Sequence, residues 1–185
     1  MSSSDQELVQ QAQAGNRQAF GILVQRHQAR VFQFVRRLHG GTDDALDITQ
    51  ETFIKAWLAL DRWRPEARFL TWLLQIARNA AFDALRQRQR RPLDPLEGDE
   101  LIDPGASPLR QLESARHLAQ LERQLAKLPL EHREILLLRE IEGLSYTELA
   151  DTLGINEGTV KSRLARAREA LLVRYRHATG GLPHD

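Results

Sequence analysis

The clearest chemical signal in the sequence is a run of hydroxyl and basic side chains between Asn156 and Glu169. Their spacing places them on one side of a helix: Thr159, Lys161, Ser162, Arg163, Arg166 and Arg168. Such a face suits DNA, because these groups hydrogen-bond to phosphates and to base edges in the grooves. A basic helix face can also be merely solvated, but together with the capped turn described next the pattern favours DNA binding.

The residues around this run predict how it is held. Ser145 and Glu148 have the spacing of a capping box, so a helix is expected to start at Ser145. Gly154 is placed to end that helix, and Asn156 to cap a second one. An inward face of the second helix is predicted from apolar residues at three- and four-residue steps: Val160, Leu164, Ala167 and Leu171. This pattern is typical of a helix-turn-helix, whose second helix lies in the DNA major groove.

A second set of residues, on a predicted helix at about 67–88, combines an aromatic ring, amides and arginines. Its members fall on one continuous face, with Arg78 near the edge: Trp72, Gln75, Asn79 and Arg86. Unpaired bases suit this combination, since rings stack on bases and arginines bind phosphates. The alternative is that Trp72 belongs to the core and Asn79 is an ordinary polar residue.

A third helix, predicted at about 43–61, has an acidic side formed by Asp44, Asp47 and Glu51, with Gln50 adjacent. From the pattern alone we favour a solubilising role for this side over a docking surface for a basic helix. A catalytic role is disfavoured, because the carboxylates lie on a regular surface with no visible pocket. His27 is expected to be a partly buried boundary residue and not a ligand, since no metal-binding partner lies at suitable spacing.

Composition narrows the class of protein. The 185 residues are 42% hydrophobic with a net charge of +1, so DNA binding must come from local clusters. The absence of cysteine excludes disulfides and thiolate chemistry. No apolar run reaches the roughly 18 residues of a membrane span, and the first residues do not resemble a secretory signal. We therefore expect a cytoplasmic protein, and we find no motif for a cofactor, a metal or enzyme catalysis.

The predicted fold is all-α, with two helical domains joined by a flexible acidic linker that contains proline and glycine. Predicted helices in the first domain cover about 4–14, 17–39, 43–61 and 67–88. The second begins with a helix at about 110–127, and Pro129 is expected just inside the next helix. The predicted boundaries are 1–91 for the first domain, 92–109 for the linker, 110–178 for the second domain and 179–185 for a frayed tail.

Three segments together, residues 44–57, 68–90 and 128–171, resemble the extracytoplasmic-function sigma factors, the small two-domain members of the bacterial sigma-70 family. The segments occur in the family's order. The resemblance implies a dissociable subunit that directs core RNA polymerase to a class of promoters, without a cofactor or a small-molecule substrate. It also implies control by an anti-sigma factor, which in many members holds the sigma factor at the inner membrane.

The resemblance also implies roles for the faces described above. The first domain would be sigma region 2, in which Asp47, Gln50 and Glu51 dock on a coiled coil of the largest polymerase subunit; this overturns the solubilising interpretation. Residues implied to recognise and melt the minus-10 element are Trp63, Arg64, Phe69, Trp72, Arg78, Asn79 and Arg86. Among these, Trp63, Arg64 and Phe69 are implied to lie beside a flipped base. The second domain would be sigma region 4, which reads duplex minus-35 DNA through Thr159, Lys161, Ser162, Arg163 and Arg166.

Two other interpretations were weighed. A stand-alone helix-turn-helix regulator would bind duplex DNA without polymerase, usually as a symmetric dimer. It would leave the Asp47–Glu51 face and the Trp72–Asn79 face unexplained. The second alternative is a helical enzyme that uses Glu51 and His27. The sequence shows no convergent set of catalytic residues to support it.

Overall fold

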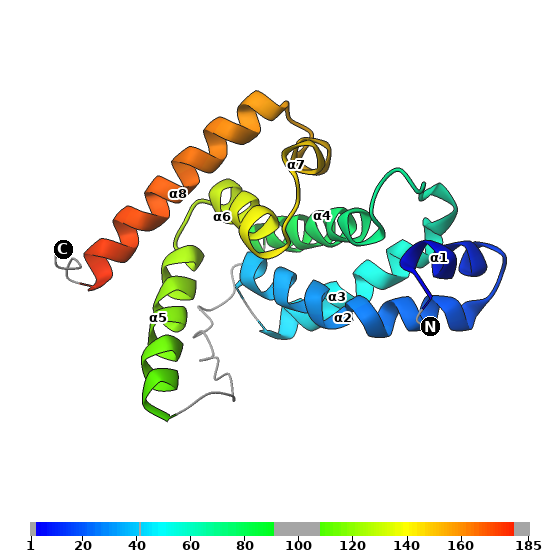
Figure 1. Ribbon diagram of the computed structural model, residues 1–185, viewed down its shortest axis with the longest axis horizontal. Helices are drawn as coiled ribbons and strands as arrows, with labels where there is room; N and C mark the ends of the chain where they lie inside the picture. Colours follow the sequence, from blue (N-terminus) through cyan, green and yellow to red (C-terminus); the bar gives the residue numbers. More distant parts are fainter. Residues whose placement is uncertain (1–2, 41, 91–107, 180–185) are drawn as a thin grey trace. The chain divides into compact units, whose positions relative to one another are not determined.

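The computed structural model describes residues 3–40, 42–90 and 108–179. It divides the chain into two compact helical units, unit 1 with helices α1 to α4 and unit 2 with helices α5 to α8 (Figure 1). The predicted all-α class is therefore confirmed. The predicted linker lies outside the described residues, apart from its last two positions. Among the described residues, no helix combines the length and the apolar character needed to cross a membrane.

Unit 1 is built on three long helices. Its elements are α1 (Asp5–Gln13), α2 (Arg17–His39), α3 (Thr42–Leu58), the 3₁₀ turn η1 (Leu60–Arg62) and α4 (Phe69–Arg90). Helices α2, α3 and α4 pack on one another, and α1 packs on α2. Their shared core contains fully buried side chains on the predicted inward stripes, including Leu23, Phe34, Leu38 and Leu73. Burial of these faces supplies the main driving force for the fold.

Local capping interactions set the helix ends in unit 1. Ser4 and Glu7 form both hydrogen bonds of a capping box at the start of α1. The Asn16 side chain caps α2, and Gly40 ends it in the left-handed conformation with φ of 87°. The predicted end of α3 was three residues too late. The chain tightens there into η1, where the Trp63 amide donates to the Leu60 carbonyl over 3.1 Å.

Unit 2 packs its longest helix against the other three. Its elements are α5 (Pro108–Ala126), α6 (Leu130–Leu136), the π-helical turn η2 (Leu137–Ile141), α7 (Tyr146–Leu153) and α8 (Glu157–Thr179). Helix α8 contacts α5, α6 and α7. Fully buried residues at these contacts include Ile135, Leu138, Leu149 and Leu164.

Two proline predictions in unit 2 need correction. Pro129 precedes α6 as its N-cap residue, with an extended ψ of 142°, and is not inside the helix. Pro108, which was assigned to the linker, is the first residue of α5. Proline is well suited to the first helical position because its fixed φ fits a helix and its missing N–H would have no partner there. The proline density of the preceding sequence had hidden this helix start.

Candidate nucleic-acid and protein interfaces

The helix-turn-helix forms as the sequence predicts. The Ser145 amide donates to Glu148 Oε2 over 2.8 Å, and the Glu148 amide donates to Ser145 Oγ over 3.1 Å. Gly154 ends α7 in the left-handed conformation, with φ of 66°. A further hydrogen bond of 2.7 Å from Thr147 Oγ1 to Glu157 Oε1 joins α7 to the first turn of α8. The Thr147–Glu157 hydrogen bond therefore holds α7 and α8 together across the turn that joins them.

Asn156 caps the start of α8. Its Oδ1 accepts the Thr159 amide at 2.8 Å and the Thr159 hydroxyl at 3.0 Å. The Ser162 hydroxyl donates to the Thr159 carbonyl over 3.1 Å. Both hydroxyl protons are thus engaged within the helix, which leaves the oxygen lone pairs of Thr159 and Ser162 as acceptors for an outside donor.

The predicted basic residues of α8 differ in how freely they can reach DNA. Lys161 is exposed, and so is Arg166, whose Nε donates to the Ser162 carbonyl over 3.3 Å. Arg163 is more covered, with Nη2 lying 3.6 Å from Glu131 Oε2. Arg168 points to η2, where Nε and Nη2 both donate to Glu140 Oε1 over 3.0 and 2.6 Å. This hydrogen bonding raises the pKa of Arg168 and ties its guanidinium to Glu140.

The inward face of α8 is confirmed in its first half, where Val160, Leu164 and Ala167 are buried. The second half lines an open groove of about 550 Å³ that the sequence analysis did not identify. Its apolar lining comes from α5, α6 and α8: Leu118, Leu121, Leu136, Leu171, Leu172 and Tyr175. Leu118 and Leu121 of α5 are exposed along this groove.

In unit 1, two of the predicted minus-10 residues are buried. Trp63 is 5% exposed and Phe69 is 3% exposed, with their ring centroids 6.4 Å apart in an edge-on arrangement. Phe69 also contacts Trp72, at 5.7 Å between centroids. Trp72 is half-buried and packs on Phe69, so it is neither a fully buried core residue nor a freely exposed ring. We call these three rings, Trp63, Phe69 and Trp72, the aromatic cluster.

The other predicted minus-10 residues lie at the surface of unit 1. Arg64 is exposed, and its Nη1 donates to the carbonyls of Asp61 and Trp63 over 2.6 and 3.0 Å. Arg78 is half-buried over the Phe82 ring, 4.6 Å from its centroid, and donates to Asn79 Oδ1 over 3.2 Å. Asn79 and Arg86 are exposed. Asn79 and Arg86 thus follow Trp72 along α4 at seven- and fourteen-residue spacing.

The predicted docking residues Asp47, Gln50 and Glu51 are all exposed on α3. The Glu51 carboxylate also pairs with Lys55 Nζ at 2.7 Å. The structure adds three exposed apolar residues to this face, because Leu46, Ile54 and Leu58 are 51%, 61% and 78% exposed. We call these six residues, Leu46, Asp47, Gln50, Glu51, Ile54 and Leu58, the α3 stripe. Sequence reasoning missed the apolar members. Leu46 and Ile54 are eight residues apart and Ile54 and Leu58 are four apart, a spacing that places all three on the same helix face as the acids.

Asp44 is not part of the α3 stripe. Its Oδ2 lies 3.6 Å from Nδ1 of the buried His39 and 3.8 Å from Nη1 of Arg88. Burial lowers the pKa of His39, and the Asp44 carboxylate opposes that shift. Asp44 therefore links α3 to neighbouring helices of unit 1, whereas the ion pair of Glu51 with Lys55 stays within α3.

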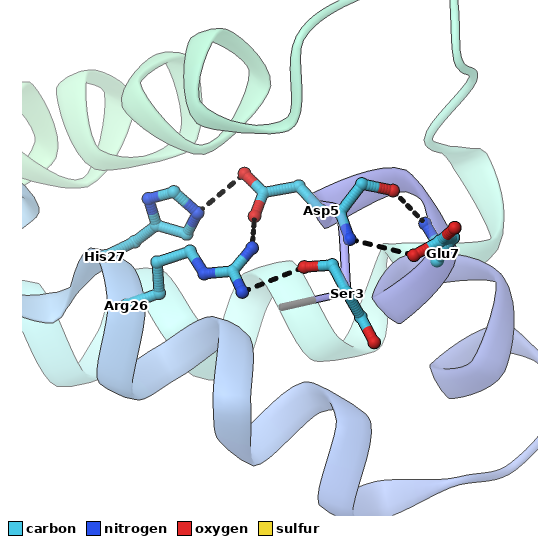
Figure 2. Close-up of polar contacts among 6 residues, drawn as sticks. Ser3, Asp5, Glu7, Arg26 and His27 are labelled. Carbon is cyan, nitrogen blue, oxygen red and sulfur yellow. Dashed lines mark hydrogen bonds and ion pairs between the residues drawn. The ribbon is translucent and has the colours of Figure 1, made fainter. Parts of the chain in front are cut away.

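His27 is buried against α1, more deeply than a boundary residue. Its Nε2 lies 2.8 Å from Asp5 Oδ2, while Arg26 Nη1 lies 2.5 Å from Asp5 Oδ1 (Figure 2). Burial lowers the pKa of His27, and the Asp5 carboxylate opposes the shift. The structure thus pairs His27 with Asp5 and not with Glu51. Among the described residues, no three His, Cys, Asp or Glu side chains are grouped to hold a metal ion.

The fold and these faces define an all-helical DNA-binding protein of the helix-turn-helix type, with a second helical unit whose α3 carries an exposed stripe of acidic and apolar side chains. Two family descriptions match the chain, Sigma-70 region 2 over residues 23–91 and Sigma-70 region 4 over residues 118–171. The chain belongs to the extracytoplasmic-function group of the sigma-70 family. Members of this family are initiation factors and not enzymes; they direct core RNA polymerase to promoters in the bacterial cytoplasm.

Relatives along almost the whole chain support this assignment. The sigma-H factor of Pseudomonas aeruginosa is 38% identical over 176 residues, covering 90% of this chain and 91% of the relative. The sigma-E factor of Escherichia coli K12 is 38% identical over 179 residues, covering 91% and 92%. A solved structure of the sigma factor RpoE with the anti-sigma factor NepR from Bartonella quintana is 27% identical, with a TM-score of 0.70 and coverage of 85% and 96%. These findings favour the sigma factor over a stand-alone regulator or an enzyme.

Proposed function

We propose that this sigma factor works through three separate surfaces. The α3 stripe docks on core polymerase, the α4 face around Trp72 captures the melted minus-10 element, and the outer face of α8 reads the duplex minus-35 element. The observation that carries the proposal is the α3 stripe, where carboxylates and large apolar side chains share one exposed helix face. Solubility alone requires the acids but gives no reason for the apolar residues.

The composition of the α3 stripe fits a basic amphipathic helix as its partner. Asp47 and Glu51 supply complementary charge, which mainly speeds and orients association. Ile54 and Leu58 supply apolar area, whose removal from water stabilises the complex. A coiled coil of the polymerase, as the family resemblance implies, offers such a helical surface.

For the minus-10 element, the exposed and buried residues take different parts. Trp72, Arg78, Asn79 and Arg86 face the strand, with the ring available for stacking and the arginines for phosphates. Arg64 extends this surface from the loop before α4. Trp63 and Phe69 support it from below as members of the aromatic cluster. Extruding a base costs a few kcal/mol, so this small surface captures melted DNA with the help of polymerase.

For the minus-35 element, Lys161, Ser162 and Arg166 are the most accessible readers on α8. Thr159 is held by the Asn156 cap and lies at the helix start, which in this motif approaches base edges. Arg163 contributes after exchanging its contact with Glu131 for a phosphate. We place Arg168 outside the interface because Glu140 already holds it.

The two units then act as linked weak binders. We retain 1–91 as region 2, end the linker at residue 107 because α5 begins at Pro108, and extend region 4 to 108–178. Each DNA contact gains effective concentration once a shared platform holds both at promoter spacing. A platform of this kind is what core polymerase supplies.

We further propose control by an anti-sigma factor that covers the α3 stripe and can retain the protein at the inner membrane. The RpoE–NepR complex of a relative supports this kind of partner. A partner on that stripe would exclude polymerase directly. The prediction is tested by asking whether a membrane-bound pool of the protein is released to the soluble fraction by Glu51→Lys.

The decisive experiment combines core polymerase, this protein and genomic DNA of the source bacterium in a transcription assay. New discrete transcripts are expected, and their start sites give both promoter elements. Glu51→Lys should abolish co-elution with core, whereas Gln28→Lys, on an exposed part of α2, should not. Asn79→Ala should keep co-elution and lose open complexes. Undiminished core binding by Glu51→Lys would remove α3 from the docking site.

A further inference from the structure

Helix α1 is tied at each end to a different part of unit 1. At its start, the Asp5 carboxylate bridges two side chains of α2, with one oxygen 2.8 Å from His27 Nε2 and the other 2.5 Å from Arg26 Nη1. Arg26 Nη2 also donates to the Ser3 carbonyl over 2.9 Å, as Figure 2 shows. At its end, Gln13 Nε2 donates to the Leu60 carbonyl over 2.9 Å.

Both ties lead to the segment between α3 and α4, residues 60–68, which we call the minus-10 loop. The Leu60 carbonyl that accepts from Gln13 also accepts the Trp63 amide at 3.1 Å, so Gln13 fixes the turn immediately before Trp63 and Arg64. At the other end of the loop, the His27 ring packs on Phe69 with centroids 5.7 Å apart. Asp5 thus holds the imidazole that supports the first residue of α4.

The loop's own packing is incomplete. Among the described residues, the buried indole N–H of Trp63 has no hydrogen-bond partner. A buried donor without an acceptor weakens the packing around it. Support from outside the loop therefore matters for its position, and α1 supplies that support at both ends. Its middle is anchored independently by the buried Leu8, Val9 and Ala12.

We propose that α1 is a positioning element for minus-10 recognition: Gln13 and the Asp5–His27 pair hold the minus-10 loop and the aromatic cluster in the geometry that captures a melted base. The inference rests on the proposed role of the α4 face and adds residues that touch no DNA. Its physical basis is preorganisation, since a loop already held in its bound geometry loses less conformational freedom on binding.

The test uses holoenzyme, assembled from core polymerase and the full chain, on a promoter mapped by the transcription assay and prepared with its minus-10 element premelted. Gln13→Met keeps the side-chain length and removes the donor. Asp5→Asn leaves a single acceptor oxygen for two donors. Each should speed dissociation of holoenzyme from this probe about fivefold, the effect of losing one or two hydrogen bonds, with core affinity unchanged.

Two further variants separate positioning from simple destabilisation. Gln10→Met makes the same substitution on an exposed site of α1 and should behave as wild type. Gln13→Lys restores a donor for the Leu60 carbonyl and should recover at least half of the lost probe lifetime, which an effect of apolar packing would not do. Loss of core affinity in parallel with probe lifetime would mean that unit 1 is unfolding and would overturn the proposal.

Asn79→Ala, measured beside them, distinguishes the two levels of the argument. If Asn79→Ala shortens the probe lifetime while Gln13→Met and Asp5→Asn do not, the α4 face binds the strand and α1 has no positioning role. If all three match wild type, the α4 face itself does not bind the strand, and the inference about α1 falls with it.

Discussion

Truncating one apolar residue of the α3 stripe should weaken polymerase binding without harming the fold. Ile54 is 61% exposed one turn before the end of α3, so little of its side chain supports unit 1. Ile54→Ala removes three carbon groups and replaces isoleucine by a better helix former. The stability of the free protein should therefore stay the same or rise slightly, whereas any partner that covers this position loses apolar contact.

The size of the effect follows from the exposed fraction. A buried carbon group contributes about 0.8 kcal/mol, so three contribute about 2.4 kcal/mol when they pass fully from water into an interface. Only the 61% that is exposed in the free protein can be newly buried, which reduces the figure to about 1.5 kcal/mol. At about 1.4 kcal/mol per factor of ten, the dissociation constant for core polymerase should rise roughly tenfold.

The assay is a competition for core polymerase against labelled wild-type protein, followed by fluorescence anisotropy. The chain contains no cysteine, so a single Ala178→Cys substitution provides a unique labelling site. Ile22→Ala is the matched control, because Ile22 is 45% exposed in the same unit but lies on α2, outside the stripe. A less than twofold change for Ile54→Ala, or an equal loss for Ile22→Ala, would refute the assignment of apolar contact to this stripe.

Three other outcomes are expected. Arg166→Ala should weaken duplex minus-35 binding and reduce the slope of log K against log salt by about 0.9, the value for one phosphate contact. Arg174→Ala, the control, should leave the slope unchanged. If Arg166→Ala has the same slope as wild type, Arg166 does not contact a phosphate. Asn156→Ala removes the cap of α8 and should therefore lower the free energy of unfolding of unit 2 by about 1 kcal/mol, measured from the unit 2 transition in a urea titration. Burial lowers the pKa of His39, so just below pH 6.5 the folded state binds fewer protons than the unfolded chain. The free energy of unfolding should therefore fall as the pH drops from 7 through 6, and it should fall less steeply in His39→Gln.

Local signals in the sequence predicted helix ends well. The capping box at Ser145 and Glu148, the glycine stop at Gly154 and the Asn156 cap depend on residues within one turn, and all three form as expected. Helix periodicity likewise identified the inward residues Val160 and Leu164. These features could be predicted because the interactions that produce them lie inside short segments of chain.

Contacts between distant segments could not be predicted in the same way. Arg168 sits on the same basic run as Arg166, and only its meeting with Glu140, 28 residues earlier, separates their roles. Trp63 lies in a proline-containing loop, a setting that suggests exposure, yet it is buried against Phe69. The partner of His27 is Asp5, and nothing in the local pattern of either residue indicates the other.

Helix α8 keeps the residues that hold it in unit 2 apart from the residues that face outward. Val160, Leu164 and Ala167 are buried, and the Asn156 cap is completed by Thr159, whereas Lys161 and Arg166 make no contact that the packing of unit 2 needs. Substitutions at those outward positions therefore carry little penalty in folding. After gene duplication, one copy could acquire a new promoter preference in a few steps while every intermediate remains folded. Parallel sigma factors in one cell could diverge along this route.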